Sequence, residues 1–94
     1  MLLEMYEIKF ADGYEKRAIK FLKKHKDVYP QYEKAIELLQ HNPQHPSLRL
    51  HKLQSKLNTF SSVSINMKYR IIIDFIIVDD VIILVDIGSH DDVY

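Results

Sequence analysis

The side chains best suited to chemistry in this 94-residue chain lie near its C-terminus and in a histidine-rich segment upstream. Arg70, His90 and Tyr94 supply a cation, a proton-transferring imidazole and an aromatic ring. His51 and Lys52 add a second imidazole and another cation. An imidazole exchanges protons near neutral pH, an arginine offsets phosphate charge, and an aromatic ring stacks on a nucleobase. These residue types therefore suit chemistry on RNA.

A structural role would use the same side chains. Arg70 could form an ion pair with Asp86 or Asp91. His90 could cap the end of a sheet, and Tyr94 could pack into the core. Residue types alone leave both roles open, so the elements that position these side chains matter.

Three apolar, β-branched runs make up most of Ser62–Tyr94. Polar residues at 66–68 separate the first two runs, Asp79-Asp80 separates the last two, and Gly88 ends the third. Val and Ile at this density favour strands, and Asp-Asp between two such runs indicates a tight hairpin turn. The segment is therefore predicted to be a three-stranded antiparallel meander.

The position of this turn predicts a register for the hairpin. Arg70 falls opposite Ser89, and Tyr69 falls opposite His90. Arg70 and His90 are therefore expected at the same end of the hairpin, with the connector bringing His51 to the same edge. The remaining predicted pairs are Val78–Val81, Ile76–Ile83, Asp74–Val85 and Ile72–Ile87.

The first half of the chain predicts a strand followed by two helices. Met5–Phe10 alternates with period two, as a half-buried strand does. Residues 12–26 and 30–42 carry helical apolar stripes, and a D-x-x-E pattern at Asp12 and Glu15 indicates a cap for the first helix. The stretch His41–Leu57 is predicted to be an extended connector with a helical turn near Pro46–Leu50.

This order of elements predicts an α+β fold. An N-terminal strand precedes an antiparallel two-helix hairpin, and the helices pack on one face of the sheet formed by the meander. Pattern does not settle where the N-terminal strand joins the sheet. The length predicts a single domain over residues 1–94.

Composition narrows the classes of function. The chain has no cysteine and neither a signal peptide nor an apolar stretch of membrane-spanning length, which predicts a cytoplasmic protein without a membrane partner. Net charge is zero, but residues 1–56 hold 11 Lys or Arg and 7 Asp or Glu, whereas residues 57–94 hold 2 and 6. The spacing of His41, His45 and His51 matches no standard metal site, and no motif for a cofactor is present.

Three stretches carry a resemblance to a known family. They are RLHKL (Arg49–Leu53), SVSINMKYRIII (Ser62–Ile73) and IILVDIGSHDDVY (Ile82–Tyr94). Together they resemble the RelE/ParE superfamily of type II toxins, in its RelE/StbE or YafQ-like branch. The ending GSHDDVY is the most specific mark, and YRII is the next.

The resemblance implies an enzyme, a ribosome-dependent mRNA endonuclease (mRNA interferase) that needs neither metal nor cofactor. In that family the 2′-hydroxyl attacks its own phosphodiester and leaves a cyclic phosphate and a 5′-hydroxyl. By the same resemblance, Arg70 supports the phosphate, His90 and His51 are acid/base candidates, and Tyr94 orients the base or the proton transfer. The cations expected to bind RNA are Arg49, Lys52, Lys56 and Lys68. The implied partners are the ribosome, mRNA and a cognate antitoxin, in a heterotetramer or larger complex.

Two departures from the family pattern leave two alternative functions open. Asp86 stands where YafQ-like sequences often carry an arginine, and Ser61 stands where many close members have a tryptophan. One alternative is a ParE-like gyrase inhibitor without nuclease activity, although His90 favours the nuclease. The other is a degenerate toxin that acts only as an antitoxin-binding module, which Asp86 and the neutral net charge favour.

Overall fold

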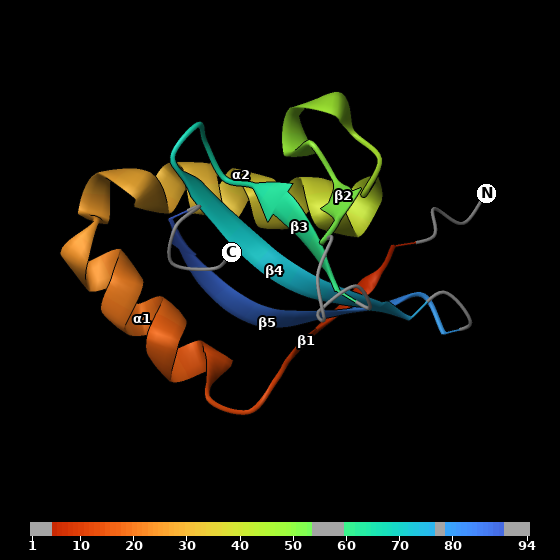
Figure 1. Cartoon of the computed structure of the whole chain (residues 1–94), viewed down its shortest axis with the longest axis horizontal. Coiled ribbons are helices and arrows are strands. Elements are labelled where there is room, and N and C mark those ends of the chain that lie inside the picture. The colour runs from red at the N-terminus through yellow and green to blue at the C-terminus, as the bar shows by residue number, and fades with distance from the viewer. Residues whose placement is uncertain (1–4, 54–59, 77–78, 90–94) are drawn as a thin grey trace.

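The computed structural model describes residues 5–53, 60–76 and 79–89, in which two α-helices lie against a mixed sheet (Figure 1). The predicted α+β fold is confirmed. In chain order the elements are β1 (Glu7–Phe10), α1 (Tyr14–Lys24), the 3-10 turn η1 (Lys26–Val28), α2 (Tyr29–His41), the 3-10 turn η2 (Pro46–Leu48), β2 (His51–Lys52), β3 (Ser61–Ser64), β4 (Tyr69–Ile76) and β5 (Val81–Ser89).

The sheet has the strand order β1-β5-β4-β3-β2. Strands β2 to β5 run antiparallel to their neighbours, as the meander predicted, and β1 pairs parallel with the first half of β5. The pairing of Glu7–Phe10 with Val81–Leu84 settles the place of the N-terminal strand, which the sequence pattern had left open.

The helices follow the predicted spans with one difference at the start of α1. Gly13 precedes this helix in the left-handed region, at φ 80°, and no side chain caps it, so the cap expected from Asp12 is wrong. Glycine adopts that conformation without a steric penalty. Helix α2 has Pro30 in its first turn, and it ends at His41 with Asn42 as its C-cap ahead of Pro43, as predicted.

The core lies between the helices and one face of the sheet. Helix α2 crosses behind β3 in Figure 1, and α1 packs against β5. Tyr69, Ile71 and Ile73 alternate along β4 into this core, while Ile72 between them does not belong to it. Burying a side chain of this size contributes about 1.5–3 kcal/mol. The fully buried side chains are Tyr14, Leu39, Leu48, Val63, Ile71, Ile73, Ile82 and Leu84, together with Ser62 on the opposite face.

The predicted hairpin register is wrong, although Asp79 and Asp80 do lie in a turn. Ile76, and not Val78, is opposite Val81, so the connection is longer than two residues. At the other end of the hairpin, Arg70 lies opposite Gly88 and Tyr69 lies opposite Ser89. The predicted pairing partner is two residues off beside the turn and one residue off at Arg70, because the register shifts by one residue between Ile73 and Ile72.

That shift is a β-bulge at Val85. Ile73 pairs with Leu84 and Ile72 pairs with Asp86, so Val85 is the extra residue on β5. Without the bulge, strict alternation from Leu84 would bury Asp86 among the helices and turn Ile87 outward. With it, Leu84 and Ile87 both reach the core. Burial of Ile87 and exposure of the carboxylate of Asp86 are the physical reason for the shift.

Candidate functional site

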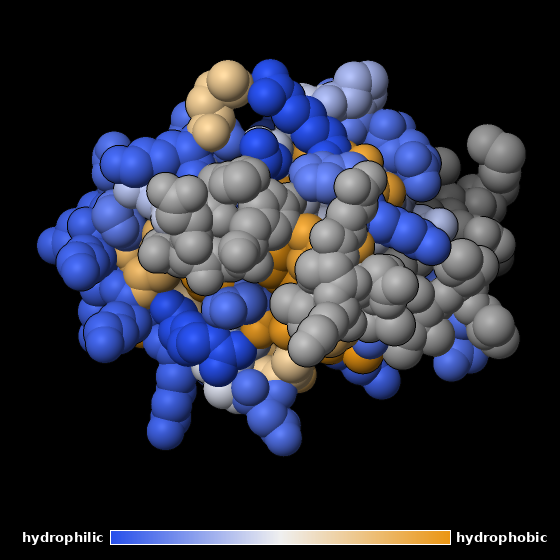
Figure 2. All heavy atoms as spheres, viewed as in Figure 1, coloured by the Kyte–Doolittle hydropathy of each residue, from blue (hydrophilic) through white to orange (hydrophobic). Residues whose placement is uncertain are grey.

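The sheet face turned away from the helices holds most of the polar side chains that the sequence analysis selected. We call it the open face, and the register places Ser62, Ser64, Arg70, Asp86 and Gly88 on it. Figure 2 shows this side of the molecule, with hydrophobic side chains at its centre and hydrophilic ones around them. Residues directly opposite one another on paired strands share a face, so Ser64, Arg70 and Gly88 form one row across it.

Arg70 is the buried cation of this row. Its side chain is half-buried, and its Nε and Nη1 atoms are shielded from solvent without a hydrogen-bond partner in the described part of the chain. A guanidinium offers five N–H donors and no acceptor, so these buried groups can be satisfied only by an oxygen or another acceptor. Gly88, opposite it, presents no side chain to the same space. Arg70 is therefore suited to a small anion.

His51 lies on the same face, two strands away. Its Nδ1 lies 3.1 Å from the carbonyl oxygen of Arg49, and its Nε2 lies 3.4 Å from Oγ of the fully buried Ser62. A carbonyl only accepts hydrogen bonds, so Nδ1 carries the proton in the neutral ring and Nε2 keeps its lone pair. Arg49 aims this carbonyl from a left-handed conformation at φ 48°. The ring is thus oriented by two contacts, with Nε2 toward the Ser62 hydroxyl as the nitrogen that can accept a proton.

Arg70 and His51 are not adjacent. Ser62 pairs with His51 on one side and with Ile72 on the other, which places His51 one row from Arg70. Strand spacing and rise per residue put their Cα atoms about 12 Å apart. A span of that size accommodates one phosphate and its ribose, with His51 at one end and Arg70 at the other.

The other predicted cations lie outside the row that holds Arg70, and the register puts Lys52, opposite Ser61, on the other face of the sheet from His51. Arg49, Lys52 and Lys68 are exposed. The ammonium nitrogen of Lys68 lies 5.4 Å from the centre of the Tyr69 ring, within the range of a cation–π contact. His90, Tyr94 and Lys56 fall outside the described residues, so their predicted positions remain predictions.

Arg17 contacts this region and was not selected from the sequence. Its Nε lies 3.2 Å from Oδ1 of Asp86, and its Nη2 donates to the carbonyl of Val85 at 2.7 Å. The expected alternative, an ion pair between Arg70 and Asp86, is therefore not what forms. The sequence separation of 69 residues between Arg17 and Asp86 hides this contact from any local pattern.

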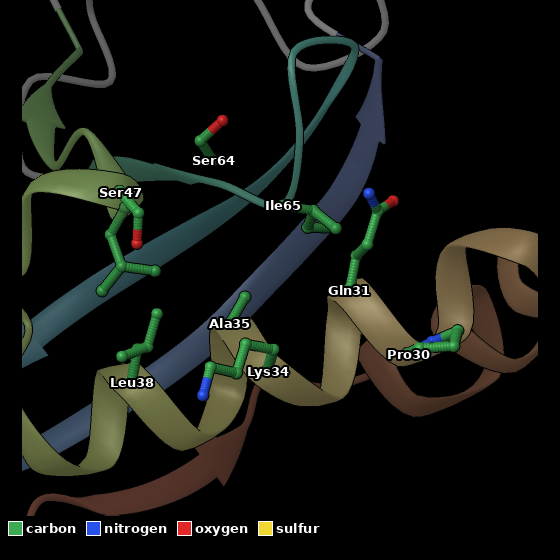
Figure 3. A pocket seen from close by; sticks show the side chains of 9 residues that line it. Pro30, Gln31, Lys34, Ala35, Leu38, Ser47, Ser64 and Ile65 are labelled. Atoms are coloured by element: carbon green, nitrogen blue, oxygen red, sulfur yellow. The ribbon is translucent and has the colours of Figure 1, made fainter.

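A separate hollow lies where β3 approaches α2, and its lining includes no acid/base pair. It is a groove of about 340 Å³ between α2 and the β3 end of the sheet (Figure 3). Its lining includes Lys34 as the charged side chain and is otherwise apolar or neutral: Pro30, Gln31, Ala35, Leu38, Ser47, Leu48, Ser64 and Ile65. Such a lining favours packing with a partner over proton transfer.

The described residues support neither a metal site nor a membrane-spanning helix. They contain no cluster of three or more His, Asp or Glu side chains placed to hold a metal ion. They also contain no helix long and apolar enough to cross a bilayer.

No protein-family model and no curated protein matches this sequence, whereas its fold matches solved structures. YafQ from E. coli strain BL21(DE3) superposes with a TM-score of 0.77 at 16% identity, over 95% of this chain and 98% of that chain. The E. coli DinJ-YafQ toxin-antitoxin complex gives 0.72 at 17%, over 95% and 97%. The heterotetrameric YoeB-YefM toxin-antitoxin complex from Staphylococcus aureus gives 0.70 at 19%, over 90% and 97%. The fold predicted from the motifs, that of RelE-like toxins, is confirmed.

Proposed function

We propose that this chain is the toxin of a type II toxin-antitoxin system and that it cleaves mRNA on the ribosome. The observation that carries this proposal is Arg70, whose buried Nε and Nη1 lack a partner in the described structure and face the side of the sheet that His51 also occupies. A buried cation with unused donors is stabilised when a phosphate supplies the missing oxygens. The fold shared with YafQ and YoeB supports the same function.

The proposed reaction requires no metal. The 2′-oxygen of a ribose bonds to the adjacent phosphorus while the bond from phosphorus to the 5′-oxygen breaks. Nε2 of His51, the nitrogen with the lone pair, takes the proton of the 2′-hydroxyl. His90 gives a proton to the departing 5′-oxygen, and Arg70 stabilises the charge that develops on the phosphate. The products are a cyclic phosphate and a 5′-hydroxyl.

The remaining residues bind rather than react. Tyr94 stacks on a nucleobase, and Arg49, Lys52, Lys56 and Lys68 contact phosphates of the message. The exposed side chains of Arg49 and Lys52, in the more basic part of the chain, support contact with RNA. The ribosome and its message are in the cytoplasm, which is where we place this protein.

A cognate antitoxin is the proposed protein partner. The solved complexes of YafQ with DinJ and of YoeB with YefM support it, and the latter is a heterotetramer. We propose a complex of this kind, in which antitoxin covers part of the apolar surface of the toxin. The groove between α2 and β3 in Figure 3 supplies such a surface.

The test is inducible expression of the wild type and of Arg70→Ala, with growth and message cleavage followed in parallel. Removing a group that stabilises developing charge lowers the rate about 10²–10³-fold. Induction of the wild type should therefore stop growth and produce new 5′-ends within messages, and Arg70→Ala should do neither. Binding of the antitoxin should persist in the variant, since Arg70 acts on RNA.

Lys20→Ala is the matched control, because it removes an exposed cation from α1, an element outside the sheet. It should remain toxic. Gyrase supercoiling is assayed in the same extracts to test the alternative without nuclease activity. A toxic Arg70→Ala variant that is folded by circular dichroism, or toxicity with intact messages and inhibited gyrase, would refute the proposal.

A further inference from the structure

The only described carboxylate beside Arg70 on the open face is held by a different arginine. Arg70 is opposite Gly88 and Asp86 is opposite Ile72, so Arg70 and Asp86 are diagonal neighbours on the same face. Such neighbours lie about 7–8 Å apart, within reach of an arginine side chain. Two opposite charges at this distance attract, yet the described structure gives Arg70 no partner.

Arg17 from α1, and not Arg70, contacts the carboxylate of Asp86. Its guanidinium makes two contacts at the bulge, one to the carboxylate of Asp86 at 3.2 Å and one to the carbonyl of Val85 at 2.7 Å. The bulge makes the second contact available, because the extra residue of a bulge leaves the strand ladder. The Oδ1 atom of Asp86 also accepts the N–H of Ile87 at 2.9 Å. Asp86 is thus fixed from two directions.

Gly13 gives the guanidinium of Arg17 its room. A Cβ atom at this position would lie 2.7 Å from Nη1 of Arg17, so the end of that flexible side chain would have to shift. The same glycine starts α1 in a left-handed conformation, from which Arg17 is reached one turn later. Gly13 therefore leaves room for the guanidinium of Arg17 in its contact with Asp86, in which both partners are close to half exposed.

We propose that Arg17 is a positioning residue for Arg70. By holding Asp86 it keeps the carboxylate from pairing with Arg70, and the donors of Arg70 stay available for the phosphate of the substrate. This inference rests on the proposed function, and it assigns a role to a residue outside the family motifs of the sequence.

The loss of Arg17 would act through charge. A released Asp86 carboxylate pairs with Arg70, and its charge then opposes a phosphate at the same place. Both effects require the negative charge of Asp86. Removing that charge as well should restore the site, whereas damage to folding would not be reversed by a second substitution in the same contact.

Four proteins separate these outcomes: wild type, Arg17→Gln, Asp86→Asn and the double variant. Glutamine at position 17 retains an N–H for the Val85 carbonyl and loses the charge, which limits the effect on folding. Message cleavage by Arg17→Gln should fall toward the loss of about 10²–10³-fold that Arg70→Ala produces. Asp86→Asn should cleave like wild type, and the double variant should recover most of the activity lost in Arg17→Gln.

Lys16→Ala is the matched control, since it removes an exposed charge from the same helix. It should behave as wild type. A double variant as inactive as Arg17→Gln would overturn the proposal, and so would full activity of Arg17→Gln itself.

A measurement independent of cleavage uses the side-chain Nε–H resonance of Arg70 in purified, isotope-labelled protein. In Arg17→Gln this resonance should shift and exchange more slowly with water, as expected of a guanidinium that has gained a carboxylate partner, and the Asp86→Asn substitution should reverse the shift. An unchanged resonance would refute the competition for Asp86. If the wild type cleaves no message, the proposed function fails while this measurement still decides the role of Arg17.

Discussion

Tyr14 and Arg70 both bury polar atoms, on opposite sides of the sheet. The hydroxyl of Tyr14 is fully buried between the helices and lies 2.8 Å from the hydroxyl of Tyr32. The Nε and Nη1 atoms of Arg70 are buried on the open face, where the described residues provide no acceptor. The helix side matches this buried hydroxyl within the protein, whereas the open face leaves two buried donors of Arg70 without an acceptor among the described residues.

The difference separates stability from function. A buried donor without an acceptor destabilises the folded state by about 1–3 kcal/mol, whereas a matched pair contributes about 1 kcal/mol to it. A chain retains the first arrangement where an acceptor from outside completes the site. The helix side therefore maintains the fold, and the open face is where a ligand is expected.

The substitution with the largest expected effect is Ile71→Ala, which tests whether the helix side maintains the fold. Ile71 is fully buried on the helix side of β4, so the substitution leaves a cavity, and the free energy of unfolding should fall by about 2–5 kcal/mol. Met67→Ala is the control, because Met67 is 76% exposed and its truncation should change stability by less than about 0.5 kcal/mol. Urea unfolding measures both. Equal losses in the two variants would contradict the assignment of the core to this face.

Arg70→Met tests the buried donors on the open face. Methionine fills similar space without buried donors, so the free energy of unfolding should rise by about 1–3 kcal/mol while message cleavage disappears. Lys20→Met, at an exposed position, should change stability by less than about 0.5 kcal/mol and retain activity. A loss of stability in Arg70→Met would show that Arg70 has a structural partner and would weaken its assignment to RNA.

The sequence predicted the elements of both faces better than it predicted their register. Runs of Val and Ile identified β4 and β5, and Asn42-Pro43 identified the end of α2, because these signals act on local backbone conformation. The bulge at Val85 acts through pairing between strands. One local sign of it exists: alternation from Ile82 and Leu84 would have buried Asp86, and that conflict indicates an extra residue.

The candidate site was predicted in part for the same reason. Arg70 and His51 were selected by residue type and motif, and the structure places both on the open face. Arg17 was missed because its partners, Val85 and Asp86, lie 68 and 69 residues away, and nothing in a helical stripe of lysines distinguishes it. Only the packing of α1 against β5 brings them together.

The smallest expected effect concerns the hydrogen bond between the hydroxyls of Tyr14 and Tyr32. Burial, followed by the hydrogen bond to Tyr32, raises the pKa of Tyr14 above its usual value, and burial raises the pKa of Tyr32 as well. Tyr14→Phe removes one hydroxyl and leaves the other without its partner, so the free energy of unfolding at pH 7 should fall by about 1 kcal/mol. Chemical denaturation measures this loss.

The same pair predicts a pH dependence with a definite sign. A raised pKa in the folded state means that the unfolded chain loses the tyrosine protons first, so the stabilisation is complete below the ordinary value of about pH 10 and declines as the pH rises above it. In Tyr14→Phe this decline should be shallower than in wild type. Tyr29→Phe, which removes the hydroxyl of a tyrosine that is 48% exposed and acts on Tyr32 only through charge, should alter the wild-type slope less than Tyr14→Phe does. Identical slopes in wild type and Tyr14→Phe would mean that the Tyr14 hydroxyl does not form a buried hydrogen bond with Tyr32. The contrast between this hydrogen-bonded pair and the donors of Arg70 would then be lost.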